Sequence, residues 1–164
     1  MKLKRPMICD IKYDLIKTTF GEFVVAITDK GISRVLFPRD KKPKISDKQK
    51  GDGEIAKILF DYMHGKEVNF STLKFDFSNC TDFQMKVYKS LAKVPFGEKV
   101  SYKKLGQMVG VPKGARAIGS AMRLNPIPIL IPCHRVLTSA GTLGGYSKGL
   151  NWKKRLLKLE KVNF

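Results

Sequence analysis

The alternation of apolar and polar residues divides the chain into a strand-rich first half and a helical second half. Three short runs rich in β-branched and aromatic residues, separated by Gly-containing turns, predict an antiparallel meander. These runs are 11–18, 22–28 and 32–37. Residues 54–63 show helical spacing of apolar residues, and residues 70–77 are expected to be extended. The first half is therefore predicted to be a sheet with one helix.

The second half predicts a series of helices. Thr81 is a candidate N-cap for the first of them, and Ser101 for a short helix over 101–110. After the tight turn GVPKG, a further helix is expected over 115–124. Two short helices joined by a Gly-containing turn are typical of a helix-turn-helix motif. A last helix is expected over 151–162, with Asn151 as its cap.

The helix at 115–124 has almost no side-chain bulk on its outer face, where Gly, Ala and Ser predominate. One explanation is close packing against a neighbouring helix. The other is that its backbone must approach a flat or narrow partner, such as a groove of DNA. The charge distribution favours the second explanation. Lys and Arg number 32 against 14 Asp and Glu, giving +18, and residues 83–164 alone hold 16 basic and 2 acidic side chains.

This asymmetry predicts a polyanionic partner for the second half, because a generally lysine-rich surface explains the total charge but not its distribution. Three cysteines without CxxC spacing and only two histidines predict neither a disulfide framework nor a metal site. No apolar run is long enough for a membrane span, and no signal peptide is recognisable in residues 1–10. A reducing compartment, the cytosol or nucleoid, is expected.

The run ILIPCHRVL at 129–137 places Cys133 and His134 in a stretch that otherwise reads as buried strand. Such a cysteine is usually an inert small hydrophobe unless a third group orients the histidine. Glu160 lies about 80° from Trp152 on a helical wheel, inside the apolar stripe of the last helix, whereas Lys153 is expected to face away. Glu160 is either a solvated helix-end residue or the group that holds His134 as the base for Cys133.

The segment NPIPILIPCHRV, followed by GGYSKG, closely resembles the active-site region of the O6-alkylguanine-DNA alkyltransferases, also called methylated-DNA–protein-cysteine methyltransferases. The resemblance extends from Phe83 to Glu160, and in the first half only the meander-then-helix layout is similar. It implies a mixed α/β fold with a ribonuclease H-like N-terminal domain at 1–78. It also implies a mainly helical domain with a helix-turn-helix motif at 79–164.

The resemblance implies that an alkyl group passes from guanine O6 in duplex DNA to Cys133, irreversibly and once per chain. His134 would be the base through a water molecule, Glu160 would orient it, and Asn125 would brace the active-site turn. The base would be flipped out of the duplex, with Tyr102 assisting rotation and donating to it and Arg116 filling the gap. Further implied contacts are the DNA-facing residues Ala115, Ala117, Ser120 and Arg123, and the pocket residues Val136, Tyr146 and Ser147.

The resemblance further implies binding in the minor groove of double-stranded DNA by a monomer that needs no cofactor or metal, located in the cytoplasm or, in a eukaryote, the nucleus. Two other classes of function remain open from the residues alone. A non-catalytic helix-turn-helix sensor of alkylated DNA would not need Cys133. A cysteine hydrolase or thiol oxidoreductase would turn over repeatedly and would not need the basic second half.

Overall fold

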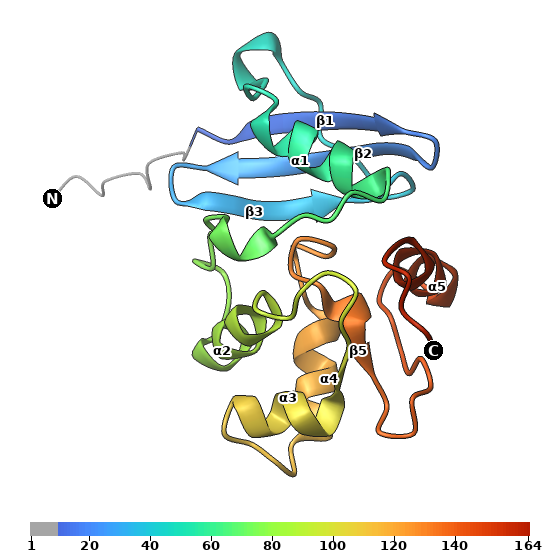
Figure 1. Ribbon diagram of the computed structural model, residues 1–164. Coiled ribbons are helices and arrows are strands. Elements are labelled where there is room, and N and C mark those ends of the chain that lie inside the picture. Colours follow the sequence, from blue (N-terminus) through green and yellow to red (C-terminus); the bar gives the residue numbers. More distant parts are fainter. Residues whose placement is uncertain (1–9) are drawn as a thin grey trace, which may run out of the picture.

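The computed structural model describes residues 10–164, and two parts stacked on one another make up the molecule (Figure 1). The first part is a three-stranded sheet with one helix, and the second is a group of helices around a short strand pair. The expectation of no signal peptide concerns residues 1–9, which include Cys9, and these lie outside the described residues. The chain is thus a mixed α/β protein, as its pattern predicts.

The predicted meander is confirmed. Strands β1 (Lys12–Thr18), β2 (Gly21–Thr28) and β3 (Gly31–Leu36) pair antiparallel in that order. The turns between them end at Gly21 and Gly31, whose φ angles of 111° and 131° are accessible to glycine and strained for other residues. β2 is the central strand and buries four consecutive residues, so that both faces of the sheet are covered at its middle.

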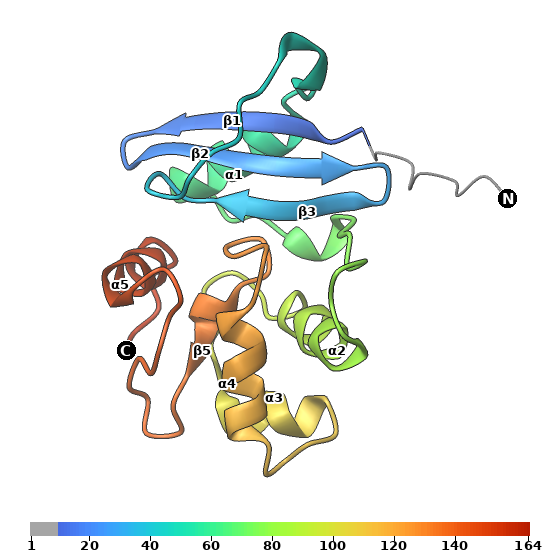
Figure 2. The same cartoon turned by 180° about the vertical axis from the view of Figure 1, so that it is seen from behind.

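Helix α1 (Glu54–Met63) lies across one face of this sheet and ends at His64, as predicted (Figure 2). Its N-cap, Gly53, has no side chain to accept the free N–H groups of the first turn. The buried Asp14 of β1 supplies the acceptors instead, from Gly53 N–H at 3.1 Å and Ala56 N–H at 2.9 Å. The strand therefore fixes where the helix begins.

The extended stretch predicted at 70–77 is only partly correct. Phe70–Thr72 forms a 3₁₀ turn, because the Asn69 side chain accepts a hydrogen bond from Ser71 N–H and tightens the chain there. Beyond it, Phe75 forms a single parallel bridge with Ile32 of β3. A second 3₁₀ turn, Asp47–Gln49, lies in the polar loop that follows β3.

The second part begins with α2 (Asp82–Leu91), whose predicted cap is confirmed: Thr81 Oγ1 accepts from Gln84 N–H at 3.2 Å. Ser101 likewise caps α3 with an acceptor for Lys104 N–H at 3.0 Å. Asn151 is not a cap, because the last helix begins one residue earlier and follows Gly149. The remaining elements are β4 (Val100–Ser101), α3 (Tyr102–Met108), α4 (Ala115–Arg123), the 3₁₀ turn Cys133–Arg135, β5 (Val136–Leu137) and α5 (Leu150–Leu159).

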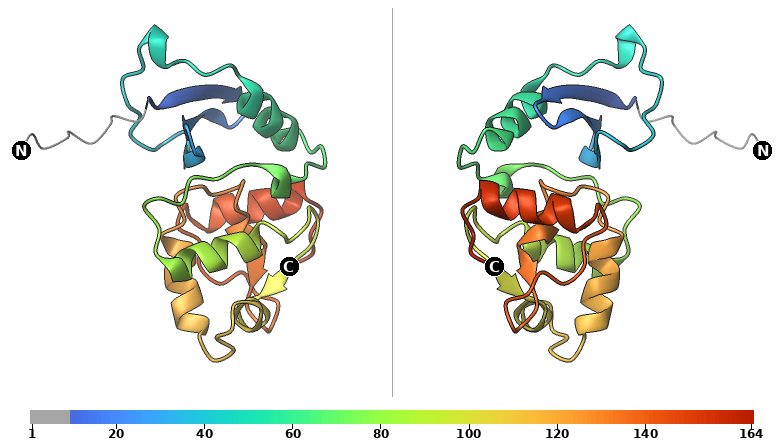
Figure 3. Two further views of the ribbon diagram at one scale, coloured as in Figure 1. Left: turned by 90° about the vertical axis from the view of Figure 1, so that its left-hand side faces the viewer. Right: turned by 90° about the vertical axis from the view of Figure 1, so that its right-hand side faces the viewer.

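One continuous core joins the two parts, which lie one above the other in both side views (Figure 3). Trp152 of α5 packs edge-on against Phe20, Phe23 and Phe37 of the sheet, with ring centroids 5.0–6.2 Å apart. The backbone also crosses the junction, where Val35 N–H donates to Pro126 O at 3.0 Å. Within residues 10–164, no helix combines the length and apolar character needed to cross a membrane.

Candidate active site

Cys133 and His134 lie in a 3₁₀ turn and not in a strand, which corrects the expectation for this stretch. The apolar run predicted their burial correctly: Cys133 is 3% exposed and His134 is fully buried. Pro132 has no N–H to donate to a neighbouring strand. The next N–H group, that of Cys133, donates to Ile131 O two residues earlier, which turns the chain. Because a turn fans its side chains out, the thiol faces a surface cavity and the imidazole points into the protein.

Asn125 makes three hydrogen bonds to the segment that leads to the cysteine. Its amide donates to Ile131 O at 3.0 Å and to Cys133 Sγ at 3.3 Å, and its oxygen accepts from Ile127 N–H. Between these contacts Ile129 has a φ of +76°, a rare conformation for a β-branched residue. The Asn125 hydrogen bonds hold this strained turn in place, and with it the position of the thiol.

Behind the thiol, four buried side chains form one hydrogen-bonded network. Glu160 Oε1 lies 2.7 Å from His134 Nε2 and accepts from the Tyr62 hydroxyl at 2.5 Å. Arg135 donates to both oxygens of Glu160, at 2.9 and 3.0 Å, and to Val94 O. Glu160 is 2% exposed, so the alternative of a solvated helix-end residue is wrong. His134 Nδ1 is buried without a protein partner among the described residues and is the nitrogen left free to accept a proton.

Burial sets the resting protonation of this network. It lowers the pKa of His134, against the opposing effect of Glu160, and raises the pKa of Cys133, against the Asn125 hydrogen bond and the charge of Lys153. Burial alone would also raise the pKa of Glu160, but the hydrogen bonds and charges of His134 and Arg135 outweigh it and lower that pKa to about 2. At neutral pH the resting site therefore holds a thiol, a neutral imidazole and a carboxylate.

Cys133 opens onto a cavity of about 440 Å³, within the range typical of small-molecule sites. Four of the residues expected to meet the base or the DNA gather there with Cys133. The lining residues are Tyr102, Gly119, Met122, Arg123, Cys133, Gly145, Tyr146 and Ser147. The Tyr146 hydroxyl is buried without a hydrogen-bond partner among the described residues. Gly144 has a φ of +63°, and a Cβ there would lie 2.9 Å from the Tyr102 hydroxyl, so this loop requires glycine.

The other residues expected to meet the base or the DNA do not line the cavity. Val136 is fully buried in β5, directly after the 3₁₀ turn. Arg116 lies on the exposed side of α4, together with Ala115, Ala117 and Ser120. These small residues face solvent, so close packing on a neighbour does not explain them, and the alternative of an approaching partner is the one that fits.

Lys153 does not face away from the core, as the helical-wheel analysis expected, but is fully buried. Its ammonium donates to three backbone oxygens, Val136 O at 2.6 Å, Gly145 O at 3.2 Å and Leu143 O. Burial lowers its pKa to about 8. Lys153 thus ties the loop that carries Tyr146 to the strand that follows the cysteine.

The sequence contained a signal for some of the residues it missed. The buried stripe of α5 runs at i, i+3, i+4 and i+7 through Lys153, Leu156, Leu157 and Glu160, a spacing that places lysine and glutamate on the inner face. An arginine inside an apolar run, as at Arg135, needs an anion, and Glu160 is one of only two acids in that half. Tyr62 gave no signal, because it lies on an ordinary apolar helix face.

Three comparisons show which known proteins this chain is similar to. The family described as "6-O-methylguanine DNA methyltransferase, DNA binding domain" matches residues 82–162. The methylated-DNA–protein-cysteine methyltransferase of Methanosarcina barkeri is 40% identical over 157 residues, covering 92% of this chain and 98% of the relative. The enzyme of that name from Metallosphaera sedula is 37% identical over 150 residues, covering 92% and 93%.

A crystal structure of the Mycobacterium tuberculosis protein OGT in complex with DNA superposes with a TM-score of 0.75 at 32% identity. The superposition covers 92% of this chain and 93% of the M. tuberculosis protein. The similarity to the archaeal relatives thus extends over both halves of the chain, beyond the segment around the cysteine that suggested the resemblance. The chain belongs to the methylated-DNA–protein-cysteine methyltransferase family.

Proposed function

We propose that this protein repairs DNA by direct damage reversal, taking the alkyl group of O6-alkylguanine onto Cys133. The single observation that carries the proposal is the position of the thiol. It lies at the inner end of a cavity, with His134 and Glu160 on its buried side, and the exposed small-residue face of α4 lies beside the cavity mouth. The substrate is O6-methylguanine in duplex DNA.

The reaction is a displacement at the alkyl carbon. The thiol proton passes to His134 Nδ1, through water, and the sulfur attacks the carbon attached to guanine O6. A carbon–sulfur bond forms as the carbon–oxygen bond breaks, and the electron pair stays on the guanine. The proton that left the thiol then passes from His134 to the guanine through solvent. Glu160 stabilises the imidazolium that forms, and Arg135 keeps Glu160 ionised throughout. A thioether has no ready leaving group, so each chain reacts once.

Around the base, Tyr102 and Ser147 supply hydrogen-bond donors to the guanine edge and so assist its departure. Tyr146 packs against the base from within the cavity, and the backbone near Val136 accepts from the exocyclic amine. Asn125 keeps the thiol aligned with the alkyl carbon. The cavity admits one flipped base, and burial keeps oxidants and other electrophiles from the cysteine.

DNA binds along α4, which enters the minor groove as the second helix of a helix-turn-helix. The close packing of α3 on the turn supports this assignment: a Cβ on Gly106 would lie 2.7 Å from Val111 O. Ala115, Ala117 and Ser120 let the helix backbone approach the groove floor, and Arg123 lies at the cavity rim. Arg116 fills the space that the flipped nucleotide leaves. The M. tuberculosis relative crystallised with DNA is consistent with this partner.

We also propose a division into an N-terminal domain at 1–78, with a ribonuclease H-like sheet and helix, and a DNA-binding and alkyl-acceptor domain at 79–164. The support is that every residue assigned to DNA and base binding lies in the segment that runs from α2 to α5. The continuous core across the junction and the hydrogen bond from Tyr62 to Glu160 make the second domain dependent on the first.

The test is incubation with excess duplex carrying O6-methylguanine, followed by intact-protein and peptide mass spectrometry. One methyl group per chain, located on Cys133, is expected, and Cys133→Ser should gain none while binding the duplex as before. Cys80→Ser, which removes the other free cysteine of the described residues, should react like the parent. Sustained turnover would favour a thiol hydrolase instead. Full repair function in Cys133→Ser would favour a non-catalytic sensor.

A further inference from the structure

A groove outside the active site runs between α2 and the segment that links the two parts. It consists of two adjoining hollows of about 890 and 700 Å³, which share Ser71, Ala92 and Lys93 in their walls. One wall is the chain at 67–78, and the other is α2 with the residues after it. Nothing assigned to alkyl transfer lies in the larger hollow.

The first wall carries an isolated β-bridge on the edge of the sheet, and the outer backbone groups of this bridge are unpaired. Ile32 of β3 uses both its backbone groups on this segment, accepting from Asp76 N–H at 2.8 Å and donating to Lys74 O at 2.9 Å. In a parallel bridge of this kind, the N–H and C=O of the intervening Phe75 point away from β3. No hydrogen bond among the described residues uses either group. The sheet therefore ends in an unpaired backbone edge that lies beside a helix.

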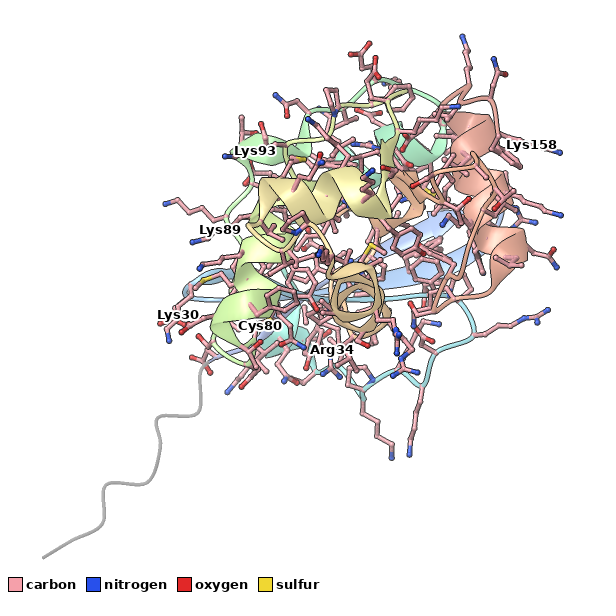
Figure 4. The ribbon with its side chains drawn as sticks, turned by 90° about the horizontal axis from the view of Figure 1, so that it is seen from below. Lys30, Arg34, Cys80, Lys89, Lys93 and Lys158 are labelled. Atoms are coloured by element: carbon pink, nitrogen blue, oxygen red, sulfur yellow. The ribbon has the colours of Figure 1, made fainter. Side chains whose placement is uncertain are left out.

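The rim of the larger hollow is positively charged. Lys89 of α2, Lys93 just beyond the end of that helix, and Lys30 from the β2–β3 turn are all exposed and lie along one side of the molecule (Figure 4). Neither Lys89 nor Lys93 pairs with a carboxylate in the described chain, and like charges at this spacing repel. The one carboxylate that lines the larger hollow, Asp76, accepts hydrogen bonds from Thr28 and Ser78 and lies near Lys30.

The floor between the edge and the lysines is apolar. The ring centroids of Phe75 and Phe77 lie 5.9 Å apart, and Met85 of α2 and Ala92, which follows that helix, also line the larger hollow. All four side chains are only partly buried, so they leave apolar surface in contact with solvent. An occupant would bury that surface, which an ordinary basic surface patch does not offer.

We propose that this groove binds an acidic, extended peptide segment of a partner protein, which adds as a strand to the Phe75 edge, with apolar residues on the floor and carboxylates toward Lys30, Lys89 and Lys93. Strand addition beside a helix uses backbone groups for affinity and alternate side chains for specificity. DNA would satisfy the lysines but would leave the amide edge and the aromatic floor unused, so a peptide is the better occupant. This activity is separate from alkyl transfer.

The test uses a fluorescent peptide in which aspartate alternates with leucine, about ten residues long. Its binding to the full chain is followed by fluorescence anisotropy. Reversing two rim charges in the double variant Lys89→Glu/Lys93→Glu should weaken binding more than about ten-fold. The matched control is Lys154→Glu/Lys158→Glu, an exposed pair of equal spacing on α5, where Lys158 lies on the opposite side of the molecule (Figure 4). This control should weaken binding less than about three-fold.

A second probe needs no protein variant. The same peptide N-methylated at every amide has no N–H left to donate to a strand edge and should also bind about ten-fold more weakly. Equal losses in the two double variants, or undiminished binding of the N-methylated peptide, would overturn the proposal. So would an undamaged duplex that displaces the peptide and loses affinity selectively in Lys89→Glu/Lys93→Glu, since the groove would then hold DNA.

Discussion

The network behind Cys133, apart from Tyr62, lies in the same half of the chain as the outer face of α4, and the two regions use polar residues in opposite ways. Around Glu160, each oxygen has at least two donors, and within the described residues only His134 Nδ1 of this network is left without a partner. On α4, Arg116 and Arg123 face solvent and make no ion pair with the described residues. One region is complete in the free protein, and the other is complementary to something outside it.

This difference separates chemistry from recognition. Removing one member of a fully hydrogen-bonded buried network lowers the unfolding free energy by several kcal/mol, because the remaining members stay buried without their partner. An exposed face loses little stability on substitution, but it loses the partner it was shaped for. Substitutions in the network should therefore impair transfer from a free base and from duplex equally, whereas substitutions on α4 should impair duplex alone.

The largest effect is expected from Glu160→Gln. Without the carboxylate, the pKa of His134 falls further below its ordinary value, and the histidine accepts the thiol proton less readily. Transfer from O6-methylguanine at neutral pH should slow about 100-fold on both substrates. The defect should shrink as pH rises, because Cys133 then ionises without a base. The measurement is the pH profile of single-turnover transfer.

Stability gives the same variant a second readout. The pKa of Glu160 is about 2 in the folded protein against a usual value of 4.5, so its stabilisation is complete above pH 4.5 and is lost as pH falls to about 2. Glu160→Gln should melt lower than the parent at neutral pH, since Arg135 is left buried and unpaired, and the difference should narrow in that acid range. His134→Gln keeps the Arg135–Glu160 ion pair. It should lose alkyl transfer, but its difference in melting temperature from the parent should not narrow at acid pH. A pH profile and melt unchanged from the parent would remove Glu160 from the relay.

The sequence predicted elements whose signals are local. The three strands, α1 and the Thr81 and Ser101 caps follow from residue spacing and turn chemistry, and the structure has them within a residue or two. Cys133, His134 and Glu160 were identified because a reactive group in an apolar run and a carboxylate on an apolar stripe both need explanation. In each case the anomaly lay within one segment.

What the sequence did not predict depends on contacts between distant segments. Tyr62 reaches Glu160 across 98 positions, and nothing in the α1 pattern indicates it. The turn at Cys133 replaced the expected strand because Asn125 and Pro132 redirect the backbone, a tertiary effect that β-propensity does not register. The pattern predicts Lys153 on the solvent side of the last helix, because a charged side chain is usually exposed. The residue is buried, since carbonyl groups of a loop can also satisfy a lysine.

A smaller and more selective effect is expected from Arg116→Ala. The side chain is exposed, lines no part of the cavity and touches no member of the network, so transfer from a free alkylguanine base should be unchanged. Transfer from duplex should slow about ten-fold, since the flipped state loses the group that fills its gap. Lys158→Ala, which removes an exposed cation of α5 that does not line the cavity, is the matched control. Equal losses on both substrates would place Arg116 with the chemistry and break the comparison.

The smallest effect on rate is expected from Tyr62→Phe, which decides whether the N-terminal part belongs to the network. The hydroxyl donates to Glu160 at 2.5 Å and lies 3.2 Å from His134 Nε2, fully buried. Its loss should cost about 1.5–3 kcal/mol of unfolding free energy, as for a hydrogen bond to a charged group. Because the carboxylate keeps Arg135 and His134, transfer should slow only about three-fold on both substrates, with a shifted pH profile.

The matched control is Tyr88→Phe, which removes another buried hydroxyl, one that donates to Ala121 O of α4 at 2.8 Å. It should also lower stability, by about 1 kcal/mol for a neutral hydrogen bond, but should leave the pH profile of transfer from the free base as it is in the parent. If both variants melt lower and neither moves the profile, Tyr62 contributes only packing. A shift confined to Tyr62→Phe would mean that the sheet domain, through one phenol, helps to set the proton affinity of the group that activates the cysteine.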